Sequence, residues 1–384
     1  MAVYKFEDIA FNSTAKKKPV DEDKYTYVGL EHLDPDSIYV TRFGADVAPK
    51  GEKLLMKKGD VLFGKRRAYQ KKVAIAPFDG IFSAHGMVLR PKEDVIDKDF
   101  FPLFIKSDYF LDEAIKISVG SLSPTINWRD LKELKFSLPS LEKQKKLARV
   151  LWSIYDTKEE YKKLIKATDD LVKSQFIEMF GELGKDDKGW GITILGQCCE
   201  LNPKRPRDIN DELMVSFVPM PAVSEDGKID CSDIRPYKEV RKGFTYFAEN
   251  DVLFAKITPC MENGKGAVAR GLEGEIGSGS TEFHVLRPIE GKSNPYWLYI
   301  LTMFDLFRVG ARKVMTGTGG QLRVPIGYLK DYPVSLPPIE LQNQFEQFVH
   351  QSDKSKFELQ DAIDNLDALS KKIIAENLMV AGKE

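Results

Sequence analysis

The feature that most constrains this chain is an internal repeat of about half its length. Three anchors recur in the same order: Gly-Asp-Val-Leu-Phe at 59–63 as Asn-Asp-Val-Leu-Phe at 250–254, Leu-Arg-Pro at 89–91 and 286–288, and Ser-Leu-Pro at 137–139 and 335–337. Each displacement lies between roughly 190 and 198 residues, growing along the chain as loop insertions would make it. A duplication predicts two similar domains, which suits a chain of 384 residues better than one domain does.

Each Leu-Pro is followed by a long run that has the pattern of a helix. The runs cover about 140–181 and 338–379, with no Pro or Gly in their interiors. Their apolar residues recur at steps of three and four, and about 40 helical residues would be about 60 Å long. This stripe favours pairing of the two helices in an antiparallel coiled coil, the alternative being two core helices of globular domains.

Between these helices the sequence predicts mixed α/β domains. Short apolar runs bounded by Gly, Pro and Asp are typical of strands, here 61–63, 73–75 and 87–89 with their counterparts 252–254, 267–269 and 283–286. The segments 100–117 and 296–309 are helical in pattern. We therefore predict a domain at 1–139, a helix at 140–182, a second domain at 183–337 and a second helix at 338–384, with pseudo-twofold symmetry.

Composition excludes several classes of protein. The chain has no run of 18 apolar residues and no signal peptide at its start, so we expect no membrane span. Its four cysteines form no C-x-x-C pair and its four histidines are scattered, which predicts reduced thiols, a cytoplasmic location and no zinc site. The net charge of −1 leaves room for a local basic patch only.

Motifs for catalysis are missing. Asn294-Pro295-Tyr296-Trp297 comes nearest to the adenine-flipping loop of a methyltransferase, but a proline helix entrance explains it better. No Gly-rich turn for a methyl donor precedes it, and there is no P-loop, no G-x-S-x-G turn and no carboxylate cluster above chance. A single-chain methyltransferase or nuclease remains the enzymatic alternative to a binding protein.

The residues best suited to binding lie in loops that occupy equivalent places in the two halves. A basic loop follows each Asp-Val-Leu-Phe strand, and a loop rich in Gly and hydroxyl residues precedes the last strand of each domain. Such loops can place Lys and Arg on phosphates, and Arg, Gln or Asn on base edges; the alternatives are a solvated loop and a tight structural turn. The candidates are Lys65, Arg66, Arg67, Tyr69, Lys71, Lys72 and Ser121 in the first half, and Lys256, Thr258, Lys265, Thr318, Gln321 and Arg323 in the second.

Basic residues also lie near the two domain starts. Lys16 and Lys17 mark the first start, and Lys204 and Arg205 mark the second. These four are predicted phosphate contacts, unless they are merely solvated.

The whole chain resembles the DNA-specificity subunits of type I restriction-modification systems. The resemblance is carried by the two Asp-Val-Leu-Phe segments and by the Gly-rich loops at Gly120 and 317–320. It extends to the openings Leu-Pro-Ser-Leu-Glu-Lys-Gln at 138–144 and Leu-Pro-Pro-Ile-Glu-Leu-Gln at 336–342, each continuing into a long helix. The first Gly-rich loop departs from the usual Gly-x-Gly form, because Gly120 is followed by Ser121 and Leu122.

The resemblance implies that each domain is a target recognition domain that reads half of a bipartite site in double-stranded DNA. It implies that the helices fix the spacing and dock two methyltransferase subunits, and it leaves open whether restriction/translocase subunits join. S-adenosylmethionine, ATP and Mg would be bound by the partner subunits, with no cofactor and no catalysis in this chain. The alternatives are a methylation-only complex and a coiled-coil scaffold that binds proteins alone.

Overall fold

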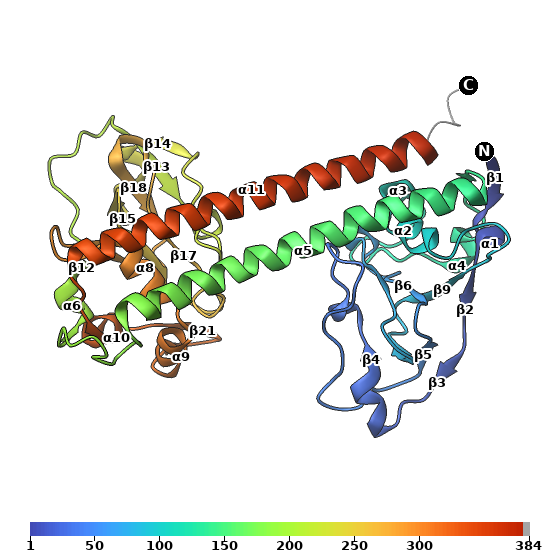
Figure 1. Ribbon diagram of the computed structural model, residues 1–384, viewed down its shortest axis with the longest axis horizontal. Helices are drawn as coiled ribbons and strands as arrows, with labels where there is room; N and C mark the ends of the chain where they lie inside the picture. Colours follow the sequence, from blue (N-terminus) through green and yellow to red (C-terminus); the bar gives the residue numbers. More distant parts are fainter. Residues whose placement is uncertain (379–384) are drawn as a thin grey trace. The chain divides into compact units, whose positions relative to one another are not determined.

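The computed structural model describes residues 1–378 of the chain (Figure 1). The chain forms two compact units. Unit 1 joins Met1–Lys162 to the chain from Gln360 onward, and unit 2 comprises Lys163–Leu359. The division falls inside both long helices, so each helix contributes to both units.

Unit 1 contains short strands and helices that lead into the first long helix. Its strands are β1 (Ala2–Lys5), β2 (Ala10–Ser13), β3 (Lys16–Lys17), β4 (Tyr27–Val28), β5 (Lys53–Met56), β6 (Val61–Phe63), β7 (Val73–Ile75), β8 (Gly80–Phe82), β9 (Met87–Pro91) and β10 (Lys135–Leu138). Its helices are α1 (Phe6–Ile9), α2 (Phe100–Lys106), α3 (Asp108–Lys116), α4 (Trp128–Leu131) and the start of α5 (Leu141–Phe180), with 3-10 turns at Asp21–Thr26, Leu30–His32 and Ala68–Gln70.

Unit 2 repeats this order between the end of α5 and the second long helix. Its strands are β11 (Ile192–Ile194), β12 (Cys199–Leu201), β13 (Met214–Val218), β14 (Ile234–Pro236), β15 (Thr245–Ala248), β16 (Val252–Ala255), β17 (Gly266–Val268), β18 (Ile276–Gly279), β19 (Phe283–Pro288), β20 (Thr316–Thr318), β21 (Gln321–Arg323) and β22 (Pro333–Ser335). Its helices are α6 (Leu195–Cys198), α7 (Tyr237–Val240), α8 (Pro295–Met303), α9 (Asp305–Lys313), α10 (Ile326–Asp331) and α11 (Ile339–Leu378), with 3-10 turns at Met220–Ala222 and Glu273–Glu275.

The two units share one sheet topology, which confirms the predicted duplication of a mixed α/β fold. The main sheet has the order β2-β9-β6-β7 in unit 1 and β12-β19-β16-β17 in unit 2, antiparallel throughout. A strand pair closes each domain, β1 with β10 and β11 with β22. The predicted strands at the repeated anchors are therefore present in both units, in equivalent positions.

The second sheets agree in three strands and differ in the fourth. A parallel pair and an antiparallel neighbour form β4-β8-β5 in unit 1 and β13-β18-β15 in unit 2. The fourth strand, β3, adds beside β5 in unit 1, whereas β14 adds beside β13, at the opposite edge, in unit 2. The repeat is therefore close in the main sheet and looser at this edge.

An ion pair explains why two of the repeated anchors recur together. Asp60 accepts hydrogen bonds from Arg90 Nε at 2.6 Å and Nη2 at 2.8 Å, and Asp251 accepts the same bonds from Arg287 at 2.8 and 2.7 Å. Both carboxylates are buried and also accept a backbone N–H, from Lys57 or Ala248. A buried carboxylate needs such partners, so the Asp of each Asp-Val-Leu-Phe and the Arg of each Leu-Arg-Pro are retained as a pair.

The glutamine of each helix opening ties the long helix to its domain. Gln144 is buried; its side chain accepts from the Asp97 N–H at 2.8 Å and donates to the carbonyls of Val95 and Pro139. Gln342 makes the matching bonds to the Asn294 N–H and to the carbonyls of Lys292 and Pro337. One amide thus satisfies three backbone groups that are buried or partly buried in each unit, which explains the glutamine of the repeated Leu-Pro-x-[Leu/Ile]-Glu-x-Gln.

Helix α5 begins and ends within two residues of the predicted 140–182, and α11 begins at Ile339, next to the predicted start at 338. Residues 379–384 of the second predicted helix lie outside the described residues. Both helices serve as core helices as well as a pair. Within unit 1 Lys158 of α5 pairs with Asp367 of α11, and within unit 2 Lys356 pairs with Asp169 at 2.8 Å, the helices running antiparallel (Figure 1). The core of unit 1 includes Ala148, Leu151 and Leu378, and that of unit 2 includes Val172, Phe176, Phe345 and Val349. The predicted boundaries at 139, 182 and 337 follow the helix ends, whereas the compact units divide within the helices.

Two of the shorter helical segments differ from the simplest expectation. The run 100–117 forms α2 and α3, which are separated at Ser107, whose side chain caps α3 by accepting from the Phe110 N–H. The counterpart in unit 2 is likewise two helices, α8 and α9. Pro295 begins α8 behind an Asn294 cap, so the Asn-Pro-Tyr-Trp segment is a helix entrance as predicted.

Candidate DNA interface

In unit 1 the structure brings the basic loop 64–72 and the loop 118–127 together. The Ile126 N–H donates to the Lys65 carbonyl at 2.9 Å, and the Ala68 N–H donates to the Pro124 carbonyl at 3.2 Å. Arg66 Nε donates to the Ser123 hydroxyl at 3.0 Å. The two loops therefore form one surface, which we call reading surface 1, beyond the ends of β6 and β7.

Reading surface 1 exposes cations beside apolar side chains. Arg66 and Arg67 are exposed, and Ser121 lies at the exposed turn. Tyr69 is 57% exposed and Leu122 is 94% exposed. Cations next to uncovered aromatic and aliphatic groups suit a nucleic acid, which offers phosphates and base faces together.

Two lysines of the basic loop, Lys71 and Lys72, are held by groups of their own domain. Lys71 Nζ binds Asp108 at 2.7 Å and Asp112 at 2.9 Å, and although burial lowers its pKa these two carboxylates outweigh burial and raise it. Lys72 Nζ donates to the Leu30 carbonyl. Lys71 and Lys72 therefore attach the basic loop to the rest of its domain.

Lys16 and Lys17 lie apart from the paired loops, on β3 of the second sheet. Lys17 binds Asp23 at 2.9 Å, and Lys16 is exposed, 3.7 Å from Glu52. Their predicted contacts with phosphate stay predictions.

In unit 2 the equivalent loops, 255–265 and 315–325, also meet, and we call the surface that they form reading surface 2. The Val324 N–H donates to the Lys256 carbonyl at 2.9 Å, which matches the bond from Ile126 to Lys65. Thr258 joins the loops twice more, because its N–H donates to the Leu322 carbonyl and its hydroxyl donates to the Gly320 carbonyl. Here the second loop is a hairpin of β20 and β21, and its turn exposes Thr318 and Gln321.

Charged side chains on reading surface 2 are paired with one another. Arg323 binds Glu282 through Nε at 2.9 Å and Nη2 at 2.7 Å, and this bonding lowers the pKa of Glu282. Lys256 lies nearby, and burial lowers the pKa of its ammonium group, opposed by Glu282. Sequence reasoning missed Glu282, since one carboxylate before a strand carries no signal of its own.

A buried arginine holds the first loop of reading surface 2. Arg308 of α9 donates to the carbonyls of Met261 and Gly264 and lies over the ring of Phe254. Burial lowers its pKa to about 10. Lys265 Nζ is turned to the Met220 carbonyl, so it too supports the loop from within unit 2.

Lys204 and Arg205 lie outside reading surface 2. Lys204 is exposed, whereas Arg205 donates to the Phe244 carbonyl at 3.2 Å and lies over the ring of Tyr237. Arg205 is therefore committed to packing against the second sheet, and Lys204 keeps its predicted role as a phosphate contact.

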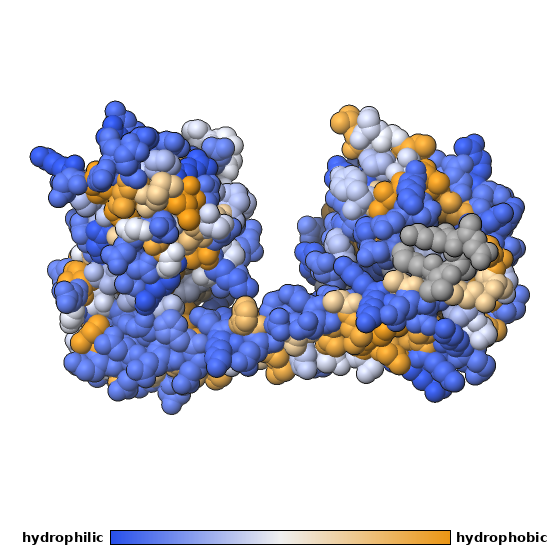
Figure 2. Space-filling view, turned by 90° about the horizontal axis from the view of Figure 1, so that it is seen from above, coloured by the Kyte–Doolittle hydropathy of each residue, from blue (hydrophilic) through white to orange (hydrophobic). Residues whose placement is uncertain are grey.

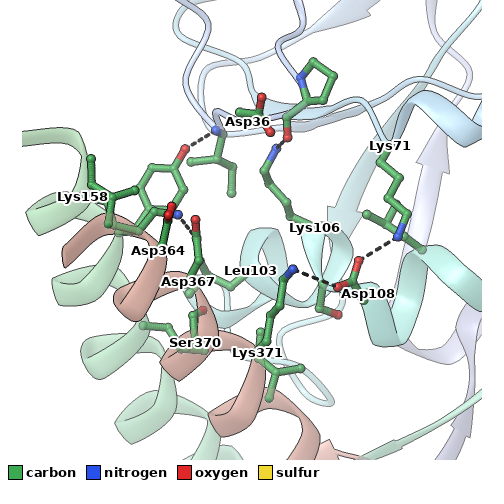
Figure 3. Close-up of a pocket in the computed structure, with 18 of the residues that line it drawn as sticks. Asp36, Lys71, Leu103, Lys106, Asp108, Lys158, Asp364, Asp367, Ser370 and Lys371 are labelled. Atoms are coloured by element: carbon green, nitrogen blue, oxygen red, sulfur yellow. Dashed lines mark hydrogen bonds and ion pairs between the residues drawn. The ribbon is translucent and has the colours of Figure 1, made fainter. Parts of the chain in front are cut away.

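Unit 1 also has a cavity of about 550 Å³ between α2, α3 and the parts of α5 and α11 that belong to it (Figure 3). Lysines point into this cavity, but each has a partner there. Lys158 faces Asp367, Lys371 faces Asp108, and Lys106 donates to the carbonyls of Pro35 and Ser37. Burial lowers the pKa of Lys106 to about 8. This balance of charge does not favour a phosphate, so the cavity is no part of the DNA interface.

The described part of the chain has neither a metal-binding cluster nor a membrane-spanning helix. Among residues 1–378, no group of three or more His, Cys, Asp or Glu side chains is placed to hold a metal ion. Within the same range, no helix has the length and apolar character that crossing a bilayer requires.

Comparison with known proteins identifies the family. The model of the type I restriction modification DNA specificity domain matches this chain twice, over residues 3–168 and 188–368. The chain therefore belongs to this family, and the two matches correspond to the two halves of the repeat.

Curated relatives agree with this assignment. The chain is 40% identical over 153 residues to the specificity subunit of the type I restriction enzyme EcoEI from Escherichia coli, covering 39% of this chain and 25% of the relative. It is 38% identical over 188 residues to the EcoAI specificity subunit of the same species, covering 47% and 31%. The aligned part of this chain thus spans between a quarter and a third of those relatives' lengths.

Solved structures share the fold. One, described as showing complex assembly and conformational transition of the type I R-M system, has 18% identity and a TM-score of 0.57 over 98% of this chain and 97% of its own. The type I S subunit from M. genitalium has 13% identity and a TM-score of 0.52 over 98% and 96%. At these identities the likeness supports the fold: two domains with long helices.

Proposed function

We propose that this chain is the DNA-reading subunit of a type I restriction-modification complex, in which each domain recognises one half of a bipartite site. One observation carries the proposal. In both units the same two loops are bonded together beyond the same strands, while the side chains they expose differ. A shared scaffold with different exposed residues is what two readers of different base sequences require.

The long helices serve two purposes in this proposal. An unbroken helix of 40 residues continues from each unit into the other, which suits a spacer between half-sites. The helices also leave large apolar side chains uncovered, and Figure 2 shows hydrophobic residues along their surface. In unit 2 Leu164, Leu171 and Phe357 are 51%, 52% and 73% exposed. Such residues suit helix-packing partners, and we assign these to methyltransferase subunits, two for each chain.

Catalysis in this proposal belongs to the partners. S-adenosylmethionine would be bound by the methyltransferase subunits, and ATP and Mg by a restriction/translocase subunit where one joins. The absence of a methyl-donor turn, a P-loop and an N-P-P-aromatic motif from the sequence supports this division.

Methylome sequencing tests the proposal. The chain is produced with a type I methyltransferase subunit in a host that lacks adenine methylation. We expect methylated adenines in one two-part motif with a fixed spacer. An unchanged set of methylated adenines would overturn the proposal, and methylation by the purified chain alone would favour the single-chain enzyme.

A set of substitutions separates DNA reading from scaffolding. Changing Lys65, Arg66 and Arg67 together to Gln removes three cations from reading surface 1, so DNA affinity should fall about 10- to 100-fold and its salt dependence should flatten. The matched control changes Lys143, Lys145 and Lys146 of α5 to Gln, with the same change in charge. If the chain is a coiled-coil scaffold that binds only proteins, the first set of substitutions should change neither DNA affinity nor its salt dependence.

A further inference from the structure

Arg323 is held in a way that leaves part of its guanidinium group available. Its Nε and Nη2 bind the two oxygens of Glu282 at 2.9 and 2.7 Å, and Nη1 lies 3.4 Å from the Gln321 carbonyl. A guanidinium group has five N–H donors in one plane, two of them on each terminal nitrogen. Three contacts therefore leave one hydrogen on Nη1 and one on Nη2 without a partner among residues 1–378.

The position of Arg323 makes these two donors useful. Its side chain is 40% exposed, and it ends β21 in the hairpin of reading surface 2, whose turn residues Thr318 to Gln321 are all exposed. Its backbone bridges to Ile257 of the first loop. Arg323 thus lies where the two loops of the surface meet.

We propose that Arg323 reads a guanine in the half-site of unit 2, with Glu282 as the positioning residue that orients its guanidinium group. The free donors on Nη1 and Nη2 can pair with the O6 and N7 acceptors that guanine presents in the major groove, the commonest specific contact of arginine. Glu282 fixes the plane of the group before DNA arrives, which reduces the conformational entropy lost on binding. This inference rests on the proposed function and deepens it by naming a base.

A purely structural role would be redundant for this ion pair. The hairpin is already joined to the first loop by Thr258 and by the bond from Val324 to Lys256. The His284 ring contacts the Val324 carbonyl at 2.8 Å as well. The arginine side chain of this ion pair is still 40% exposed, so the pair adds little stability. Its geometry is better explained by a contact between the free donors of Arg323 and a base.

Unit 1 has no equivalent of this pair, which makes the prediction specific to one half-site. The strand pairing aligns Phe63 and Met87 with Phe254 and His284, so His85 takes the place of Glu282. The bridge between Arg66 and Thr125 corresponds to that between Ile257 and Arg323, so Thr125 takes the place of Arg323. Only the half-site read by unit 2 should therefore depend on this pair.

The experiment is selection of bound DNA from a library with both half-sites randomised, using the full chain with its methyltransferase partner. We expect the unchanged chain to prefer guanine at one position of one half-site by about 10-fold or more. Arg323→Lys keeps the charge but loses the paired donors, so this preference should fall below about 3-fold, with all other positions unchanged. Glu282→Gln should weaken the same preference, and it should tighten binding to unrelated DNA, because the surface becomes more positive.

Arg270→Lys is the matched control. Arg270 binds Glu346 at 2.8 Å with side-chain exposures of 43% and 22%, close to the 40% and 23% of Arg323 and Glu282. It follows β17 at the end away from the reading loop, so its change should leave every base preference intact.

The outcomes separate this inference from the proposed function. A chain that selects no two-part site overturns the proposed function. A chain that selects one, and keeps the same preferences after Arg323→Lys, overturns the inference alone. Weaker binding to all sequences, with no position relaxed, assigns the pair a structural role and also overturns it.

Discussion

Reading surfaces 1 and 2 share a backbone bond between their loops, from Ile126 to Lys65 and from Val324 to Lys256, but are held by different side chains. In unit 1 a loop cation, Lys71, reaches back to carboxylates on α3. In unit 2 the cation lies on the helix instead of the loop, because Arg308 of the corresponding helix α9 donates to two loop carbonyls. The scaffold thus fixes where the loops lie, while each unit uses its own chemistry to hold them.

The exposed arginines differ in the same way. Arg66 of surface 1 is held by a neutral hydroxyl, that of Ser123, through a single bond. Arg323 of surface 2 is held by two bonds to a carboxylate. The arginine of surface 1 is therefore less restrained than that of surface 2, since a single neutral bond restrains a side chain less.

The largest predicted effect tests what the two units share. Gln144→Leu and Gln342→Leu each leave three buried or partly buried backbone groups without a partner, so each should lower the free energy of opening of its own unit by about 3 kcal/mol. Hydrogen exchange of the β9 and β19 amides in increasing urea measures this separately for each unit. Equal loss in both units from either substitution would contradict the description of two separately stabilised cores.

Gln351→Leu is the control for this pair of substitutions. Gln351 lies on α11 and is exposed, so its replacement should change the free energy of opening by less than about 0.5 kcal/mol. A larger change would mean that a leucine on the helix surface disturbs the fold by itself.

The second prediction concerns the loop anchors, where the units differ. Arg308→Met leaves the buried Gly264 carbonyl without a donor, whereas the Met261 carbonyl keeps the Gly264 N–H at 3.2 Å. The substitution should therefore favour local opening of loop 255–265 by about 2 kcal/mol. Lys71→Met removes an ion pair with half-exposed carboxylates and should favour opening of loop 64–72 by less than about 1 kcal/mol. Amide exchange in the two loops measures whether Arg308→Met has the larger effect. Equal effects of the two substitutions would contradict the difference in loop anchoring between the units.

The sequence was sufficient to predict the scaffold, which consists of the repeated strands and the long helices, because these elements occur twice. Asp60 with Arg90, and Gln144 with its counterpart Gln342, could be recognised as anchors without knowing what they bind. The starts of both long helices and the end of α5 followed from the prolines before them and the absence of Pro or Gly within them. Repetition therefore predicted both the fold and the place of the reading loops.

The details of the reading surfaces could not be predicted in this way. A basic residue in a loop looks the same whether it faces solvent, as Arg67 does, or an acidic helix, as Lys71 does. Partners such as Glu282 and Ser123 come from distant or unremarkable positions, and only the fold brings them to the loops. The domain boundaries also followed the helix ends, because sequence alone does not show that a long helix divides its apolar residues between two cores.

The smallest predicted effect concerns pH and distinguishes the two surfaces again. His284 contacts the Val324 carbonyl through Nε2 at 2.8 Å and the Asn202 amide through Nδ1 at 3.3 Å, an arrangement that suits the neutral ring with its proton on Nε2. Burial lowers the pKa of His284, and Lys256 adds to this while Glu282 opposes it. In unit 1 the equivalent residue is Met87, which does not titrate.

The sign of the effect follows from the lowered pKa. Below about pH 6.5 the unfolded chain binds this proton more readily than the folded one, so acidification through this range lowers the stability of unit 2. Amide exchange at 320–325, corrected for the intrinsic effect of pH, should therefore increase relative to exchange at 122–127. His284→Met should abolish this difference. If the difference in exchange persists in His284→Met, another group causes it. The prediction that His284 makes the hairpin of surface 2 more sensitive to acid than surface 1 is then wrong.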